Sequence, residues 1–238
     1  MRGVALSQKD DSVLFSINQI QNASLNCASE SNDAVDAMGT PIATFYRAKS
    51  AEFSAENALF DMNLMATQLG TAKKVASSAN KIVAPAMESF TAKGGTYTLK
   101  HAPKTAPTEI YALNSDSTFG TKYVKSTNKS ATTFAINGRE ITLPEGLAEG
   151  TEMFVMYEYE TENAVEVVNS ATNFPVGCKF VMEVLGCDVC DQTNLVYAYV
   201  IFNNAKLSPD FDWSIATDGT HPFSMKAQQD LKYRSLAA

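Results

Sequence analysis

Strand-like alternation of apolar and polar residues runs through both ends of the chain and is densest in its middle. Near the N-terminus, Val13, Phe15 and Ile17 alternate with polar or small neighbours. Near the C-terminus, residues 178–185 repeat the pattern, and residues 195–203 form a further strand-like run. Because a period of two residues places alternate side chains on opposite faces of a sheet, this pattern predicts a mainly β fold. We interpret the two ends as parts of one sheet and the middle as an insertion into it.

The middle of the chain carries the strongest local signal. Residues 132–136 and 139–143 alternate around Asn137-Gly138, a pair that accepts the positive φ values of a type I′ turn. This pattern predicts a β-hairpin with a two-residue loop, in which Phe134 lies opposite Ile141.

A composition shift at Gly94-Gly95 marks the start of this region, and strand-like residues 153–161 close it. A run of short strands with turn signals between them is typical of a small sandwich or barrel. We therefore expect an inserted β-sandwich-like subdomain at residues 97–161. Residues 1–96 and 162–238 would form a discontinuous β core.

One helix is expected beside the N-terminal strands. Ser54 is a plausible N-cap, apolar residues recur at helical spacing through residues 55–69, and Gly70 supplies a stop signal. Residues 71–93 are rich in Ala, Ser and Lys and fit either a loop or a long hairpin.

Two strand-like segments have unusual faces. In residues 42–53 neither face is apolar enough for a core strand, so we expect part of it to meet water or another subunit. Residues 195–202 are apolar on both faces, which is typical of a central strand covered on each side. The cover can come from its own domain or from a neighbouring subunit.

Charge and hydropathy exclude several classes of protein. The net charge of −7 disfavours a nucleic-acid-binding surface, which needs clustered cations. No stretch approaches the roughly 20 apolar residues of a membrane helix, and the N-terminus lacks a signal-peptide core. Synthesis in a reducing cytoplasm is therefore expected, and the 4 cysteines are interpreted as thiols.

The cysteines include one metal-like cluster, Cys187-Asp-Val-Cys190 with Cys178 nearby. Tetrahedral zinc requires four ligands, and no fourth lies close, since Cys27 and both histidines are distant in sequence. A redox Cys-x-x-Cys would begin a helix, whereas this one falls between two strands. Buried structural thiols are the better interpretation.

The remaining candidates for chemistry are two histidines and three carboxylates. No nucleophile motif accompanies His101 or His221, so both are expected in turns or at the surface. Asp210, Asp212 and Asp218 lack the spacing of a calcium loop and are expected to be solvated. No phosphate-binding glycine loop exists. We therefore predict no catalytic, cofactor or metal site and expect the protein not to be an enzyme.

Three segments resemble the tube-forming major tail proteins of bacteriophages, namely residues 32–62, 200–210 and 218–228. The inserted β region is similar to the additional domains that some of these proteins carry. The resemblance implies a two-sheet β-sandwich or barrel with one flanking helix. It also implies six copies in a ring, joined by strand edges, and rings stacked into a tube.

Partners and location follow from the same resemblance. They are other copies of the chain, the tape-measure protein inside the tube, and sheath, baseplate and tail terminator proteins. DNA would pass through without specific binding, which suits the acidic balance. The protein would be assembled in the host cytoplasm and belong to the tail of the virion.

Two other classes stay open. A head decoration or other capsid-associated protein would also be β-rich, acidic and free of catalytic residues, although the helix at residues 55–69 favours the tube. A hydrolase or carbohydrate-binding module would need a cluster of exposed aromatics or paired carboxylates. Trp213 beside Asp210 and Asp212 is the only hint of this in the sequence, and core packing is the better interpretation of that tryptophan.

Overall fold

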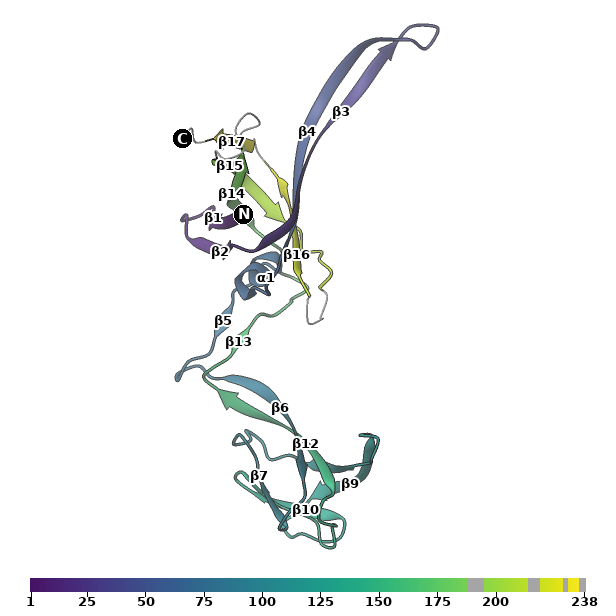
Figure 1. The fold of residues 1–238 in the computed structure, drawn as a ribbon, viewed down its shortest axis with the longest axis vertical. Helices are drawn as coiled ribbons and strands as arrows, with labels where there is room; N and C mark the ends of the chain where they lie inside the picture. The colour runs from purple at the N-terminus through teal and green to yellow at the C-terminus, as the bar shows by residue number, and fades with distance from the viewer. Residues whose placement is uncertain (188–194, 214–218, 229–230, 236–238) are drawn as a thin grey trace. The chain divides into compact units, whose positions relative to one another are not determined.

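The protein folds into two compact units (Figure 1). The structure, a computed structural model, describes residues 1–187, 195–213, 219–228 and 231–235. Unit 1 consists of residues 1–73 and 167–238, and unit 2 of residues 74–166. The inserted subdomain at residues 97–161 stays a prediction. Within the described residues, no helix has the length and apolar character that a bilayer span requires.

Unit 1 is built on one sheet with strand order β2-β1-β14-β15-β16-β4-β3, and β17 also pairs with β15. β1 pairs with β14 and β16 pairs with β4, so both ends of the chain contribute to this sheet. The described elements of unit 1 are β1 (Arg2–Ser7), β2 (Val13–Ile17), β3 (Ile20–Val35), β4 (Pro41–Asn57), α1 (Met62–Gln68), β14 (Gly177–Cys187), β15 (Leu195–Leu207), β16 (His221–Ala227) and β17 (Leu231–Ser235).

The core of unit 1 is a cluster of phenylalanine rings from five strands. Phe53 of β4 lies 5.8 Å from Phe180, 6.0 Å from Phe202 and 5.9 Å from Phe223, measured between ring centroids. Phe15 joins the cluster from β2, 6.2 Å from Phe180. Tilted rings at these separations are favourable packing arrangements, and together they bury a large apolar area. The predicted mainly β fold is confirmed.

The helix is shorter than predicted. It spans Met62–Gln68, and its N-cap is Asp61, whose Oδ1 accepts hydrogen bonds from the backbone N–H groups of Asn63 and Leu64 at 2.8 Å each. The prediction of residues 55–69 with Ser54 as the cap was wrong. Residues 55–57 instead continue β4 and pair with β16, because the sheet hydrogen bonds and buried side chains there outweigh local helix propensity.

The predicted stop at Gly70 is confirmed. Its φ is +63°, its N–H donates to the Thr67 carbonyl at 3.2 Å, and the Thr71 N–H donates to the Ala66 carbonyl at 2.9 Å. These two bonds form a Schellman motif, in which glycine suits the left-handed position. A Cβ at Gly70 would lie 2.1 Å from the Phe174 carbonyl oxygen, so the close approach of that loop also requires glycine.

Unit 2 has a sheet of its own, with strand order β6-β12-β8-β9-β10-β11-β7, and a short β13–β5 pair. β6 pairs with β12 along its whole length. Residues 71–93 therefore contain a strand of the sheet, so the expectation of a loop or a long hairpin there was wrong. The elements of unit 2 are β5 (Lys74–Val75), β6 (Ile82–Thr91), β7 (Thr96–Thr98), β8 (Glu109–Leu113), β9 (Phe119–Lys125), β10 (Thr133–Asn137), β11 (Glu140–Thr142), β12 (Glu152–Thr161) and β13 (Val165–Glu166).

The β10–β11 hairpin is confirmed, but its register differs from the predicted one. Asn137 pairs with Glu140, so the two loop residues are Gly138 and Arg139. Ile141 therefore lies opposite Ile136 and not opposite Phe134. Only Gly138 of the loop has a positive φ, +57°, whereas a type I′ turn requires two such residues. The shift is two residues, so the predicted apolar face stays buried.

A buried carboxylate fixes the interior of unit 2. Glu88 of β6 is 3% exposed and accepts hydrogen bonds from the hydroxyls of Tyr157 and Tyr97 and from the Lys100 backbone N–H. Burial alone would raise the pKa of Glu88, but these hydrogen bonds outweigh it and hold the pKa below the ordinary value. Burial and the hydrogen bond to Glu88 raise the pKa of each tyrosine to about 12.

Candidate assembly surface

The longest hairpin of the chain, β3–β4, extends unit 1 at the edge of its sheet (Figure 1). Its turn is shaped by Asp36, whose side chain accepts hydrogen bonds from the Met38 N–H at 2.8 Å and the Thr40 N–H at 2.9 Å. The Asp36 backbone N–H donates to the Thr40 carbonyl at 2.9 Å, and Gly39 takes a φ of +83°. Aspartate and glycine therefore close this turn for local reasons.

The outer part of this hairpin has no cover. β16 pairs with β4 only over residues 52–57, and β3 is the last strand of the sheet. Every residue from Asn26 to Ser50 is exposed, and we name residues 26–50 the distal hairpin. A two-stranded hairpin is only marginally stable in water by itself, and unpaired strand edges readily pair with another chain. Both strand edges of the distal hairpin are thus open to pairing.

Side chains on the distal hairpin are suited to contact. Its apolar members are large and exposed, and Phe45 for example is 61% exposed. Soluble proteins seldom leave an apolar group of this kind open to water unless it binds something. The expectation that part of residues 42–53 is not a core strand is confirmed. The exposed large apolar residues of the distal hairpin are Val35, Met38, Ile42, Phe45 and Tyr46.

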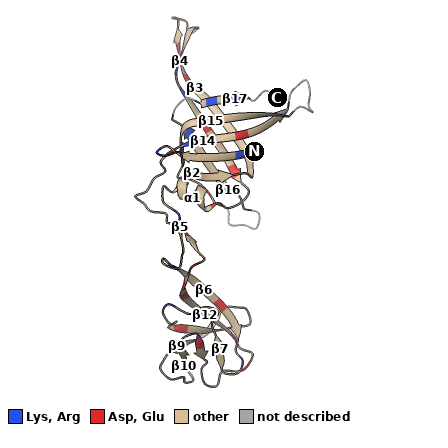
Figure 2. Ribbon diagram, turned by 90° about the vertical axis from the view of Figure 1, so that its left-hand side faces the viewer, with Lys and Arg blue, Asp and Glu red and all other residues tan. Residues whose placement is uncertain are grey.

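The two strands of the distal hairpin carry opposite charge (Figure 2). Glu30, Asp33 and Asp36 lie on β3 and the turn, and Arg47 and Lys49 lie on β4. Within the part of the chain that the structure describes, none of these five side chains forms an ion pair. Both signs are therefore available to a neighbouring molecule, and complementary charges steer association and fix register.

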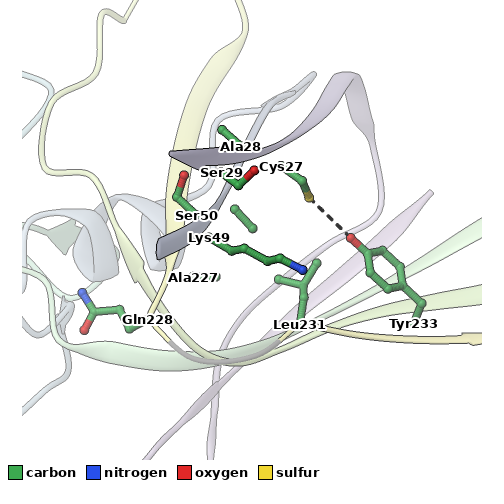
Figure 3. Close-up of a pocket in the computed structure, with 10 residues that line it drawn as sticks. Cys27, Ala28, Ser29, Lys49, Ser50, Ala227, Gln228, Leu231 and Tyr233 are labelled. Atoms are coloured by element: carbon green, nitrogen blue, oxygen red, sulfur yellow. Dashed lines mark hydrogen bonds between the residues drawn. The ribbon is translucent and has the colours of Figure 1, made fainter. Parts of the chain in front are cut away.

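The base of the hairpin and the C-terminal strand enclose a hollow of about 860 Å³ (Figure 3). Cys27 and Lys49 line it from β3 and β4, and Leu231 and Tyr233 line it from β17. The Cys27 sulfur lies 3.6 Å from the Tyr233 hydroxyl, and this hydrogen bond raises the pKa of Tyr233. Among the described residues that line the hollow there is one thiol and no carboxylate.

The cysteine cluster predicted to be structural is described only in part. Cys178 is fully buried, and burial raises the pKa of its thiol to about 11, which keeps it protonated and unreactive. The side chain of Cys187 and all of Cys190 lie outside the described residues. Elsewhere, in the residues that are described, no three His, Cys, Asp or Glu side chains come together as metal ligands would.

The two histidines behave differently. His101 is exposed and stacks on Tyr159 with ring centroids 3.9 Å apart, as a surface residue can. His221 is 1% exposed, so the surface prediction for it was wrong. Its Nε2 lies 2.8 Å from the side-chain oxygen of Gln68, which ties helix α1 to β16, and burial lowers its pKa. No sequence pattern predicts this contact, because Gln68 is remote along the chain.

The carboxylates near the C-terminus are described only in part. Asp210 and Asp212 are exposed, as predicted, and Asp218 lies outside the described residues. Trp213 was predicted to pack in the core, and this was wrong. It is 41% exposed and stacks on Phe60, with ring centroids 4.5 Å apart and planes 11° from parallel.

Comparison with known proteins identifies one family. None of the curated proteins matches the chain. The model of one family, described as the YomU/Tube protein family, matches residues 3–232. This match confirms the resemblance to bacteriophage tail tube proteins. Because the match covers nearly the whole sequence, the chain belongs to the YomU/Tube protein family.

Proposed function

We propose that this protein polymerises as stacked hexameric rings into the tail tube of a bacteriophage and that the tube conducts the genome during ejection. The family match supports a structural protein of the phage tail tube. The observation that carries the proposal is the distal hairpin, with two unpaired strand edges and exposed apolar side chains. Pairing with a neighbouring copy would satisfy its edges, and a closed ring would leave none open.

A second surface of unit 1 supports the same assembly. Val200 and Phe202 of β15 are buried, whereas Tyr197 on its other face is half exposed. Leu185 of β14 pairs with Tyr197 and is also half exposed. One face of this central pair of strands is thus covered by the chain itself. The other face is also apolar in sequence, so in this proposal a neighbouring subunit packs on it and covers it.

The charge balance suits a conduit. A net charge of −7 repels the phosphate backbone of DNA, so the genome would pass without specific binding. The tape-measure protein would occupy the tube before ejection, and sheath, baseplate and tail terminator proteins would contact its outside and ends. In this proposal the chain has no catalytic role, is assembled in the host cytoplasm, and functions in the virion tail.

Negative-stain microscopy of the purified chain tests the proposal. Rings with sixfold symmetry or filaments about 100 Å wide are expected, given six domains of this mass around a pore. Strictly monomeric particles at high concentration, with no tail-like polymers, would contradict it. A head decoration protein is the alternative, and it would be monomeric or trimeric and bind capsids.

Excision of unit 2 is expected to leave ring formation intact. Residues 74–166 form their own hydrophobic core, and unit 1 closes its sheet without them. A chain in which a short Gly-Ser linker joins Lys73 to Val167 should therefore fold and assemble. Microscopy of this variant beside the full chain provides the measurement. Loss of rings from a well-folded variant would place unit 2 in the assembly interface.

A further inference from the structure

Unit 2 has a hollow of about 460 Å³ on its own surface, unrelated to the distal hairpin. Phe119 of β9 and Phe154 of β12 form one side of it, and the loop between β8 and β9 forms another. Its volume lies in the range typical of small-ligand sites, about 300–1,000 Å³. We name it the aromatic hollow. The residues that line it are Ser89, Leu113, Asn114, Ser115, Ser117, Phe119, Glu152 and Phe154.

Phe119 is the exposed aromatic ring at this hollow, and its neighbours hold it in place. Phe119 is 62% exposed, and its ring centroid lies 5.2 Å from Phe154 and 5.1 Å from Tyr111. The Tyr111 hydroxyl donates to Glu109 at 2.6 Å, and Lys122 donates to the same carboxylate at 3.0 Å. Phe119 is thus fixed by two half-buried rings, Tyr111 and Phe154, before any ligand arrives. Such pre-organisation lowers the entropic cost of binding.

The loop opposite the rings is also rigid and polar. The Asn114 N–H donates to the Thr118 carbonyl at 2.9 Å, and the Asp116 carboxylate accepts from the Thr118 hydroxyl at 2.6 Å. Ser117 is held at a φ of +64°, a conformation that is uncommon outside glycine and frequent at ligand sites. In the described residues, the hydroxyls of Ser115 and Ser117 make no hydrogen bond to the rest of the protein. They remain available to a ligand.

From this geometry we propose that the aromatic hollow binds a neutral saccharide, with a sugar ring stacked on Phe119 and its hydroxyls bonded by Ser115 and Ser117. A sugar ring has an apolar C–H face and a polar rim, which match the two sides of the hollow. No Lys or Arg lines the hollow, and Glu152 does, so an anionic ligand such as a phosphate is disfavoured. The exposed ring of Phe119 and the unbonded hydroxyls of Ser115 and Ser117 are the features that carry this proposal.

Titration of the full chain with chitotriose, maltotriose and cellotriose tests the inference. At least one of these neutral trisaccharides is expected to bind, as measured by calorimetry and by saturation transfer from protein to sugar in NMR. Phe119→Ala should weaken that binding by about tenfold or more, since it removes the stacking platform. Val124→Ala, an exposed truncation on the same strand and outside the hollow, should change it by less than about twofold.

A second variant keeps the test independent of folding. Ser115→Ala removes an exposed hydroxyl that makes no internal hydrogen bond, so the fold should be unaffected while binding falls by about fivefold. The inference is overturned if none of the three sugars binds at about 10 mM. It is also overturned if Phe119→Ala leaves sugar binding unchanged but disrupts rings in microscopy, because the hollow would then be a protein contact. Rings that form normally with Phe119→Ala leave the proposed tube function standing either way.

Discussion

Shortening the β3–β4 hairpin is expected to abolish rings and tubes while leaving a folded protein. The variant replaces residues 30–48 with Asn-Gly, so that the paired residues Ser29 and Lys49 flank a two-residue turn. Every residue removed is exposed, so the core of unit 1 keeps all of its buried side chains. The assembly contacts that we propose for the distal hairpin are lost. Microscopy and size-exclusion chromatography measure the assembly.

The control for this variant is its own thermal stability. Its unfolding temperature should match that of the full chain at concentrations where both are monomeric, since exposed substitutions change stability by about 0.5 kcal/mol or less. Phe45→Asp keeps the hairpin and adds a charge to its exposed apolar surface, so it should weaken assembly without unfolding the protein. Tubes of normal width from the shortened chain would refute the assembly role of the hairpin.

The sequence could predict the buried strands well, because burial on one face creates a period of two. Phe180 and Met182 on β14, and Met153 and Val155 on β12, are buried as their alternation indicates. The distal hairpin has no buried face, so its residues have no reason to alternate. β3 nevertheless continues to Val35 before the turn. The distal hairpin, which is the largest candidate surface, is thus the part of the chain with the weakest alternation of apolar and polar residues.

Contacts between side chains of different elements could not be predicted from the sequence either. The helix was placed too early because Ser54 is a good cap by composition, and only the pairing of β4 with β16 shows why Asp61 takes that role. His221 was expected at the surface because its partner Gln68 comes from a different element. The exposure of Trp213 and Phe119 likewise depends on how the other segments of the chain pack around them. Sequence patterns indicate which residues of one element share a face, so they do not predict contacts between side chains of different elements.

Removal of the Glu88 carboxylate is expected to destabilise unit 2 strongly. Glu88→Ala leaves the hydroxyls of Tyr97 and Tyr157 and the Lys100 N–H without their acceptor inside the protein. A loss of about 3–5 kcal/mol in the free energy of unfolding follows, because buried donors lose a charged partner. Glu88→Gln keeps an acceptor oxygen and should lose less. Glu158→Ala, an exposed carboxylate on β12, is the matched control and should change little.

The same cluster predicts how the stability of unit 2 depends on pH. The pKa of Glu88 is lowered in the folded state, so its contribution is present above the ordinary value of 4.5 and is lost as pH falls through the lower folded pKa. The pKa values of Tyr97 and Tyr157 are raised from 10.0 to about 12, so their contribution is present below pH 10 and is lost as pH rises through about 12. The unfolding temperature of unit 2 should therefore fall at both the acid and the alkaline end of this pH range. The variant with both Tyr97→Phe and Tyr157→Phe should lose the alkaline decline, and an unchanged decline in that variant would show that other groups cause it.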